Sequence, residues 1–110
     1  MHRAITIAEN ANCPLYIVHL MCRESAEEVL RAKNKGLLVY GETLAATLGT
    51  DGSKLWDRDW DVASRYVMSP SLNPDPKVKT QLMKYLGSGV IDLVGTDNCT
   101  FCTDQKRMGR

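Results

Sequence analysis

Three ionisable side chains stand where short apolar runs of the sequence end. His19 comes at the end of the run that begins at Leu15, Glu42 follows residues 37–40, and Asp97 follows residues 90–94. In parallel α/β folds, the residues that do chemistry lie at the carboxyl ends of the strands. We therefore expect His19 and Asp97 to lie at the same end of a parallel sheet, with converging side chains.

Each of these side chains has a chemical and a structural interpretation. His19 can present a neutral imidazole to a metal, or it can bond to a backbone carbonyl in the core. Asp97 can coordinate a metal or act as a base, or it can cap the segment that follows it. For Glu42 we favour a buried structural hydrogen bond over chemistry.

The cysteines form no convincing metal or redox motif. Cys99 and Cys102 make a CxxC, but Cys13 and Cys22 flank an apolar run and are too far apart to form the second pair of a zinc knuckle. A redox CxxC is expected at the start of a helix after the first strand of its unit, whereas this one follows the last apolar run. We interpret all four as reduced thiols of a cytoplasmic protein.

The apolar periodicity predicts strands alternating with helices. The expected helices cover 2–11, 26–35 and 77–86, and the expected strands cover 15–20, 37–40 and 90–94. Ser25 and Glu28 fit a capping box for the second helix. Strand, helix and strand joined by short connections form a βαβ unit with parallel strands. Residues 43–76 are expected to be an ordered excursion with one short helix near 60–66.

Composition is that of an ordinary globular domain and excludes several classes of protein. Hydrophobic residues make up 44% and charged residues 25% of the 110 residues, and the formal net charge is +1. The near-neutral charge argues against nucleic-acid binding, and no apolar run approaches the length of about 18 residues that spans a bilayer. The first expected helix has no residue before it that caps it. We therefore expect residues 1–110 to be a partial domain of a larger enzyme, incomplete at both ends.

Five segments occur in an order that resembles one enzyme family. They are Pro14-Leu15-Tyr16-Ile17-Val18-His19, Val39-Tyr40-Gly41-Glu42, Leu48-Gly49-Thr50-Asp51-Gly52, Ser69-Pro70 and Gly95-Thr96-Asp97-Asn98-Cys99-Thr100-Phe101. Together they resemble the dihydropyrimidinases and hydantoinases, which are cyclic amidohydrolases. The resemblance spans essentially the whole chain.

The resemblance implies a fold, a reaction and a setting. It implies a fragment of a (β/α)8 TIM-like barrel, with strands six, seven and eight at residues 15–19, 37–42 and 90–95. It also implies two zinc ions and hydrolysis of the ring amide of dihydropyrimidines. A cytoplasmic enzyme of pyrimidine catabolism, assembled as a homotetramer at full length, is the expected context.

The resemblance also assigns roles to three residues. It makes His19 a metal ligand, Asp97 both a metal ligand and the catalytic base, and Ser69 a substrate-binding residue through its backbone. The family's His-x-His pair, its carbamylated lysine and its strand-five histidine have no counterpart in this sequence. At Ser71 and Asn73 the chain departs from the family's usual Ser-Pro-Pro-Leu-Arg, which leaves the choice between dihydropyrimidines and hydantoins open.

Two alternatives stand beside the enzyme interpretation. The collapsin response mediator proteins are non-catalytic scaffolds with the same barrel, and they lack the metal-binding histidine and aspartate that this chain keeps as His19 and Asp97. A small independent α/β binding domain is the other alternative. Retention of both residues favours the enzyme.

Overall fold

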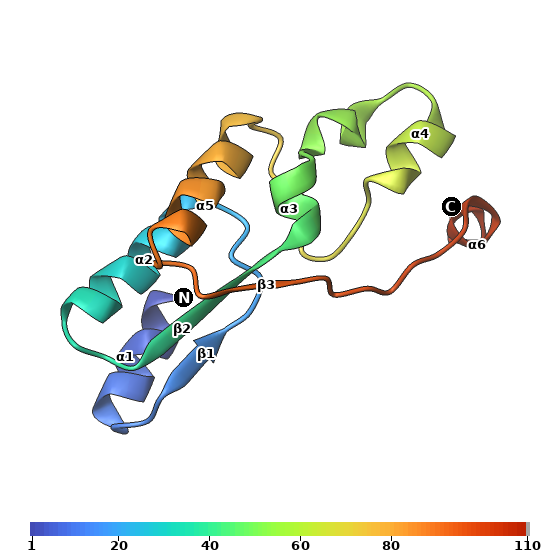
Figure 1. Cartoon of the computed structure of the whole chain (residues 1–110). Helices are drawn as coiled ribbons and strands as arrows, with labels where there is room; N and C mark the ends of the chain where they lie inside the picture. The colour runs from blue at the N-terminus through green and yellow to red at the C-terminus, as the bar shows by residue number, and fades with distance from the viewer. Residues whose placement is uncertain (110) are drawn as a thin grey trace.

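Three parallel strands form the centre of the molecule in the computed structural model, which describes residues 1–109. Strands β1 (Leu15–Ile17), β2 (Val39–Leu44) and β3 (Leu93–Gly95) lie side by side in that order. Helices α1 (His2–Asn10) and α2 (Arg23–Asn34) precede β1 and β2, and α5 (Lys77–Gly87) precedes β3 (Figure 1). The predicted parallel α/β arrangement is therefore confirmed.

One face of the sheet is covered by helices and the other is open. Along β2, Val39 and Gly41 are buried whereas Tyr40 between them is 46% exposed. Val39 joins one hydrophobic cluster with residues of α1, α2 and α5, among them Ile5, Val29 and Leu82. This alternation is expected of a strand with an apolar layer on one side only.

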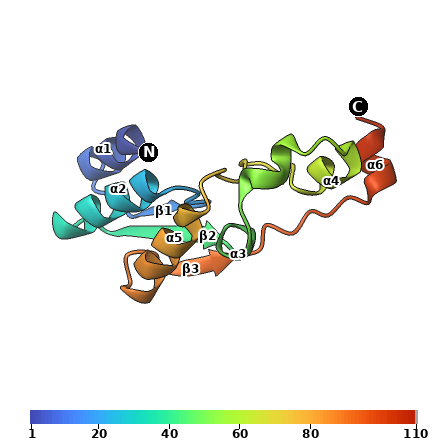
Figure 2. The same cartoon turned by 90° about the horizontal axis from the view of Figure 1, so that it is seen from above.

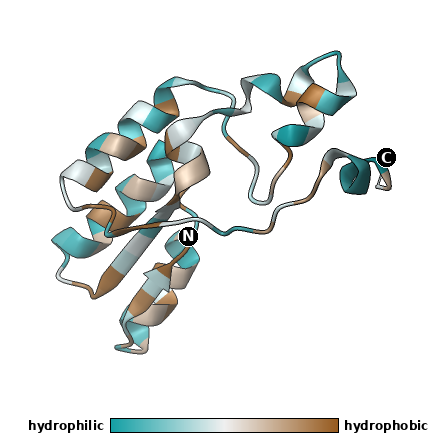
Figure 3. Ribbon diagram, turned by 45° about the vertical axis from the view of Figure 1, so that its right-hand side comes forward, coloured by the Kyte–Doolittle hydropathy of each residue, from teal (hydrophilic) through white to brown (hydrophobic). Residues whose placement is uncertain are grey.

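A second part of the chain extends away from the sheet. Helix α3 (Ala45–Gly49), the 3-10 helix η1 (Gly52–Trp56) and α4 (Trp60–Arg65) form an arm beyond the carboxyl ends of the strands, and the C-terminal α6 (Thr103–Arg107) lies beside α4 (Figures 1 and 2). The hydrophilic α6 (Figure 3) is tied to the arm by Lys106. Its Nζ donates to the carbonyl oxygens of Ser64 at 2.5 Å and Val67 at 3.0 Å.

Several element boundaries differ from those expected. Strand β1 ends at Ile17, β2 runs on to Leu44, and β3 begins only at Leu93. Residues Val90 and Ile91 are buried in the helical layer instead, where both backbone N–H groups donate to the carbonyl of Tyr85. An apolar run can therefore reflect burial against a helix as well as strand pairing.

The excursion and the helix caps also differ in detail. The helix expected near 60–66 is present as α4, but α3, η1 and α6 had not been predicted. The residue that caps α2 is Cys22, with Ser25 completing the capping box, so the predicted pairing of Ser25 with Glu28 is wrong. Among the described residues, no helix combines the length and hydropathy needed to cross a bilayer.

Candidate metal and substrate site

His19 and Asp97 meet beyond the carboxyl ends of β1 and β3. His19 Nε2 lies 3.5 Å from Asp97 Oδ2, and the two side chains are 26% and 43% exposed. Their convergence at one end of the sheet is as predicted. An imidazole nitrogen and a carboxylate oxygen side by side are donors of the kinds that zinc accepts.

Both residues adopt a backbone conformation that side chains rarely tolerate. The φ angles are +59° at His19 and +46° at Asp97, and among the described residues the other non-glycine position with positive φ is Asn12. Such a conformation costs on the order of 1–3 kcal/mol and persists where the surroundings fix it. Both donors are therefore aimed by turns that leave the strand direction.

The turn at His19 is held by hydrogen bonds between β2 and Leu20, the residue that follows His19. Leu20, which is fully buried, donates its N–H to the Glu42 carbonyl at 2.7 Å. Its own carbonyl accepts a hydrogen bond of 2.7 Å from the hydroxyl of Thr43, which is also fully buried. These two bonds fix the peptide groups on either side of Leu20.

The Glu42 side chain makes a hydrogen bond, as predicted, but on the open face of the sheet and half-buried. Its Oε2 accepts a hydrogen bond of 2.5 Å from the hydroxyl of Tyr16 on β1. This bond is the largest cause of the raised pKa of Tyr16, because losing the phenolic proton would break it and place two anions together. A Cβ added at Gly95 of β3 would lie only 2.7 Å from the Glu42 carboxylate, so that carboxylate lies directly over the glycine.

A cavity of about 570 Å³ brings Ser69, the remaining residue with a role assigned from the sequence, together with Asp97. It lies between the arm and residues 96–106, and both Ser69 and Asp97 line it. Arg65 and Phe101 also line this cavity. No motif marked Arg65, which lies within an excursion of weak periodicity, whereas Phe101 belongs to a quoted segment but had no assigned role.

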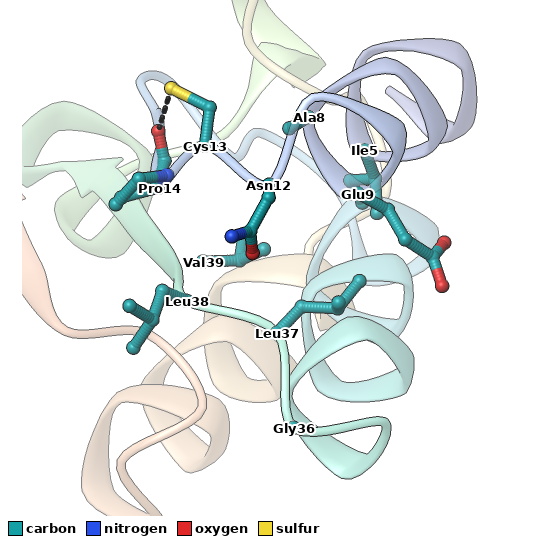
Figure 4. A pocket seen from close by; sticks show the side chains of 10 residues that line it. All are labelled: Ile5, Ala8, Glu9, Asn12, Cys13, Pro14, Gly36, Leu37, Leu38 and Val39. Carbon is teal, nitrogen blue, oxygen red and sulfur yellow. Dashed lines mark hydrogen bonds between the residues drawn. The ribbon is translucent and has the colours of Figure 1, made fainter.

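A smaller cavity of about 200 Å³ lies at the opposite end of the sheet (Figure 4). It is enclosed by α1, residues 12–14 and residues 36–39, near the amino ends of β1 and β2. Its side chains include Cys13, whose thiol contacts the Pro14 carbonyl at 3.5 Å. The cavity shares no lining residue with the one that contains Asp97.

All four cysteines are free thiols. Cys102 is the N-cap of α6, where its side chain accepts from the Gln105 N–H and Gln105 Oε1 accepts from the Cys102 N–H at 2.9 Å. Cys22 has the same kind of capping role at α2. Helix capping thus accounts for Cys102 without metal or redox chemistry, in line with our interpretation of the CxxC.

His19 and Asp97 fit zinc as part of a site. Throughout residues 1–109, no three His, Cys, Asp or Glu side chains are grouped so that they could hold a metal ion. A catalytic zinc ion usually takes three protein ligands, so two donors leave room for others. The fold and this pair define a class: a parallel α/β structure with metal-type donors at the carboxyl ends of its strands.

Comparison with known sequences defines the class of protein more narrowly than the fold and the His19–Asp97 pair do. No family model matches the chain. The chain is 50% identical over 109 residues to dihydropyrimidinase of Dictyostelium discoideum, and 50% identical over 108 residues to that of Rattus norvegicus. These alignments cover 99% and 98% of this chain but only 22% and 21% of the relatives. Identity to dihydropyrimidinase-related protein 5 of Homo sapiens is 35% over 109 residues.

Solved structures agree with the sequences. A D-hydantoinase (dihydropyrimidinase) from Thermus sp. superimposes with a TM-score of 0.90 at 34% identity, over 98% of this chain and 23% of that one. Another D-hydantoinase gives a TM-score of 0.85 at 35% identity, over 91% of this chain and 21% of the other. The chain belongs to the dihydropyrimidinase and hydantoinase family, and it spans about a fifth of the length of the relatives it matches.

Proposed function

We propose that this chain contributes part of the active site of a zinc-dependent cyclic amidohydrolase that opens the ring amide of dihydropyrimidines. The observation that carries the proposal is the approach of His19 Nε2 to Asp97 Oδ2, at 3.5 Å, beyond the ends of two parallel strands. It occurs in a sequence half-identical to two dihydropyrimidinases. In this proposal both residues are metal ligands.

The proposed setting is a (β/α)8 barrel in which β1, β2 and β3 are strands six, seven and eight. The open face of the sheet supports it, because Tyr16, Tyr40 and Leu93 are 48%, 46% and 44% exposed there. In a closed barrel such side chains fill the interior. A cytoplasmic homotetramer is the assembly that the family resemblance implies, and it forms part of the same proposal.

The reaction needs a better nucleophile than water and a proton for the departing nitrogen. Bound zinc supplies the first by lowering the pKa of water, and it can also polarise the amide carbonyl. Asp97 Oδ2 would accept the proton that the water loses as its oxygen bonds to the carbonyl carbon, and would deliver that proton to the ring nitrogen as the C–N bond breaks. His19 would offer its imidazole Nε2 as a ligand to the metal.

The cavity that contains Asp97 is the proposed substrate site. A six-membered cyclic amide fits within its volume of about 570 Å³, and Ser69 lines it. In this proposal the Ser69 backbone contacts the ring. Phe101 adds an apolar wall and Arg65 a cation. The polar groups of a cyclic amide require such a mixture of apolar and polar lining.

The scaffold alternative receives less support. Identity is 46–50% to relatives named dihydropyrimidinase from animals and Dictyostelium discoideum, and 35% to the one named dihydropyrimidinase-related protein 5. The chain also keeps a histidine and an aspartate, His19 and Asp97, whose side chains approach to 3.5 Å. We therefore place the chain with the enzymes.

A chimera tests the proposal. The aligned 108 residues of the Rattus norvegicus dihydropyrimidinase are replaced by those of this chain, and zinc content and dihydrouracil hydrolysis are measured. We expect zinc to be retained and dihydrouracil to be hydrolysed. A folded, zinc-loaded chimera without hydrolysis would contradict the proposed reaction and favour the scaffold.

A further inference from the structure

We propose that Glu42 is a positioning residue for the pair formed by His19 and Asp97. Its carboxylate is bonded to the strand that leads to His19 and lies over the strand that leads to Asp97. The geometric part of this inference stands on the contacts alone, whereas its effect on turnover rests on the proposed function.

The contacts of Glu42 reach both neighbouring strands. Toward β1, Oε2 accepts the Tyr16 hydroxyl at 2.5 Å, three residues before His19. Toward β3, the carboxylate covers Gly95, two residues before Asp97, so closely that a Cβ there would lie 2.7 Å from Oε1. One side chain of the middle strand thus bridges the two segments that diverge from the sheet to form the pair.

The backbone of Glu42 acts on the same turn. Its carbonyl accepts the Leu20 N–H at 2.7 Å, directly after His19. Glu42 is therefore held at both its carbonyl and its carboxylate by residues of the chain segment that carries His19. Because His19 has a positive φ that neighbouring contacts must maintain, loss of this support would release the imidazole from its place beside Asp97.

The same arrangement accounts for the glycine at position 95. A Cβ added there would come closer to Glu42 than 3.0 Å, a separation that real Cβ atoms essentially never show, so the flexible end of the Glu42 side chain would have to move. Any other residue at position 95 would therefore push the carboxylate off β3. The glycine that leads into Asp97 leaves the space that the Glu42 carboxylate occupies.

The test uses three substitutions in the chimera: Glu42→Ala, Tyr16→Phe and Gly95→Ala. Zinc affinity, kcat and KM for dihydrouracil are measured for each. We expect Glu42→Ala and Gly95→Ala to lower zinc affinity and kcat by about 10- to 100-fold, with little change in KM, because the ligand pair loses its geometry. Tyr16→Phe should have a smaller effect of the same kind, since Glu42 keeps its place over Gly95.

Matched controls separate positioning from general damage. Tyr85→Phe removes another Tyr–Glu contact, of 3.4 Å to Glu27, on the helical layer, and Gly87→Ala adds a methyl group where no atom lies within 4 Å. Neither should change zinc affinity or kcat. The double variant Glu42→Ala with Gly95→Ala should be no worse than Glu42→Ala alone, because the added methyl group then meets no carboxylate.

Each outcome either supports or overturns the positioning role proposed for Glu42. Glu42→Ala and Gly95→Ala variants that match their controls in zinc affinity and kcat would overturn the inference, as would losses no larger than the loss of folded protein seen by circular dichroism. If the parent chimera holds zinc without hydrolysing dihydrouracil, the proposed function fails while zinc affinity still tests Glu42. A folded parent that holds no zinc would overturn both proposals.

Discussion

Asp97 carries the most demanding role of any residue in the proposed reaction. In the chimera, replacing Asp97 by Asn should abolish measurable hydrolysis while leaving the fold intact. The amide keeps the size of the carboxylate but cannot carry a proton from water to the ring nitrogen. General acid–base steps contribute on the order of 10²- to 10⁴-fold in rate, and the weakened metal ligand adds to that loss.

The nearby cysteines provide the comparison for this prediction. Cys99 and Cys102 are exposed free thiols, and Cys102 caps α6, so replacing both by Ser should change zinc content and rate far less. Loss of metal and activity in the cysteine double variant, together with a near-normal rate for Asp97→Asn, would make the CxxC the functional element. The assignment of Asp97 would then be wrong.

Single residues of the site differed in how far the sequence could identify them. His19 and Asp97 were found because the carboxyl end of a parallel strand is a position that sequence can locate. The turns that aim them were not foreseeable, since neither residue is a glycine and the supporting bonds come from Glu42 and Thr43, more than 20 residues from His19. Arg65 could not be found at all, because its place depends on how the arm folds against residues 96–106.

At the scale of elements, local signals predicted the bounds of the longer helices better than those of the strands. The periodicities of α2 and α5 reflect a single buried face each and gave both helices within a few residues. Strand β3 was placed too early because Val90 and Ile91 are apolar for another reason, namely their burial beside Tyr85. The short, hydrophilic α6 has no buried face to generate a period, so only its cap and its contacts with α4 define it.

The link between the arm and α5 gives a prediction about acid stability. Asp51 caps η1 through the Ser53 N–H at 3.0 Å, and its other oxygen lies 3.4 Å from Lys79 Nζ. Hydrogen bonding from Ser53, with a smaller contribution from Lys79, holds the pKa of Asp51 below its ordinary value of 3.8. A depressed folded pKa means that the stabilisation is complete above the unfolded value and is lost as pH falls through the folded one.

Acid titration of the 110-residue chain checks this prediction. Backbone amide shifts of residues 51–56 should change below a pH of about 3.8 as η1 loosens. The Asp51→Asn variant, which cannot titrate there, should lack this transition, whereas Glu9→Gln on the distant α1 should keep it. An unchanged acid transition in Asp51→Asn would show that other carboxylates hold η1 to the body of the chain.

For the molecule as a whole, the decisive feature is a ligand set that the described chain leaves incomplete. His19 and Asp97 approach each other, but residues 1–109 hold no group of three potential ligands. Two donors hold a zinc ion poorly, because coordination by only two protein groups recovers little of the hydration that the ion gives up.

We therefore expect the 110-residue chain alone to bind zinc weakly, through this pair, and to hydrolyse no dihydrouracil. Zinc content after dialysis against the metal should be low and should fall further in His19→Ala but not in His2→Ala, whose imidazole lies on α1 beside Glu28. Turnover by the pure 110-residue protein, or stoichiometric zinc that survives His19→Ala, would show that the chain contains a complete site elsewhere and would overturn the division of ligands inferred here.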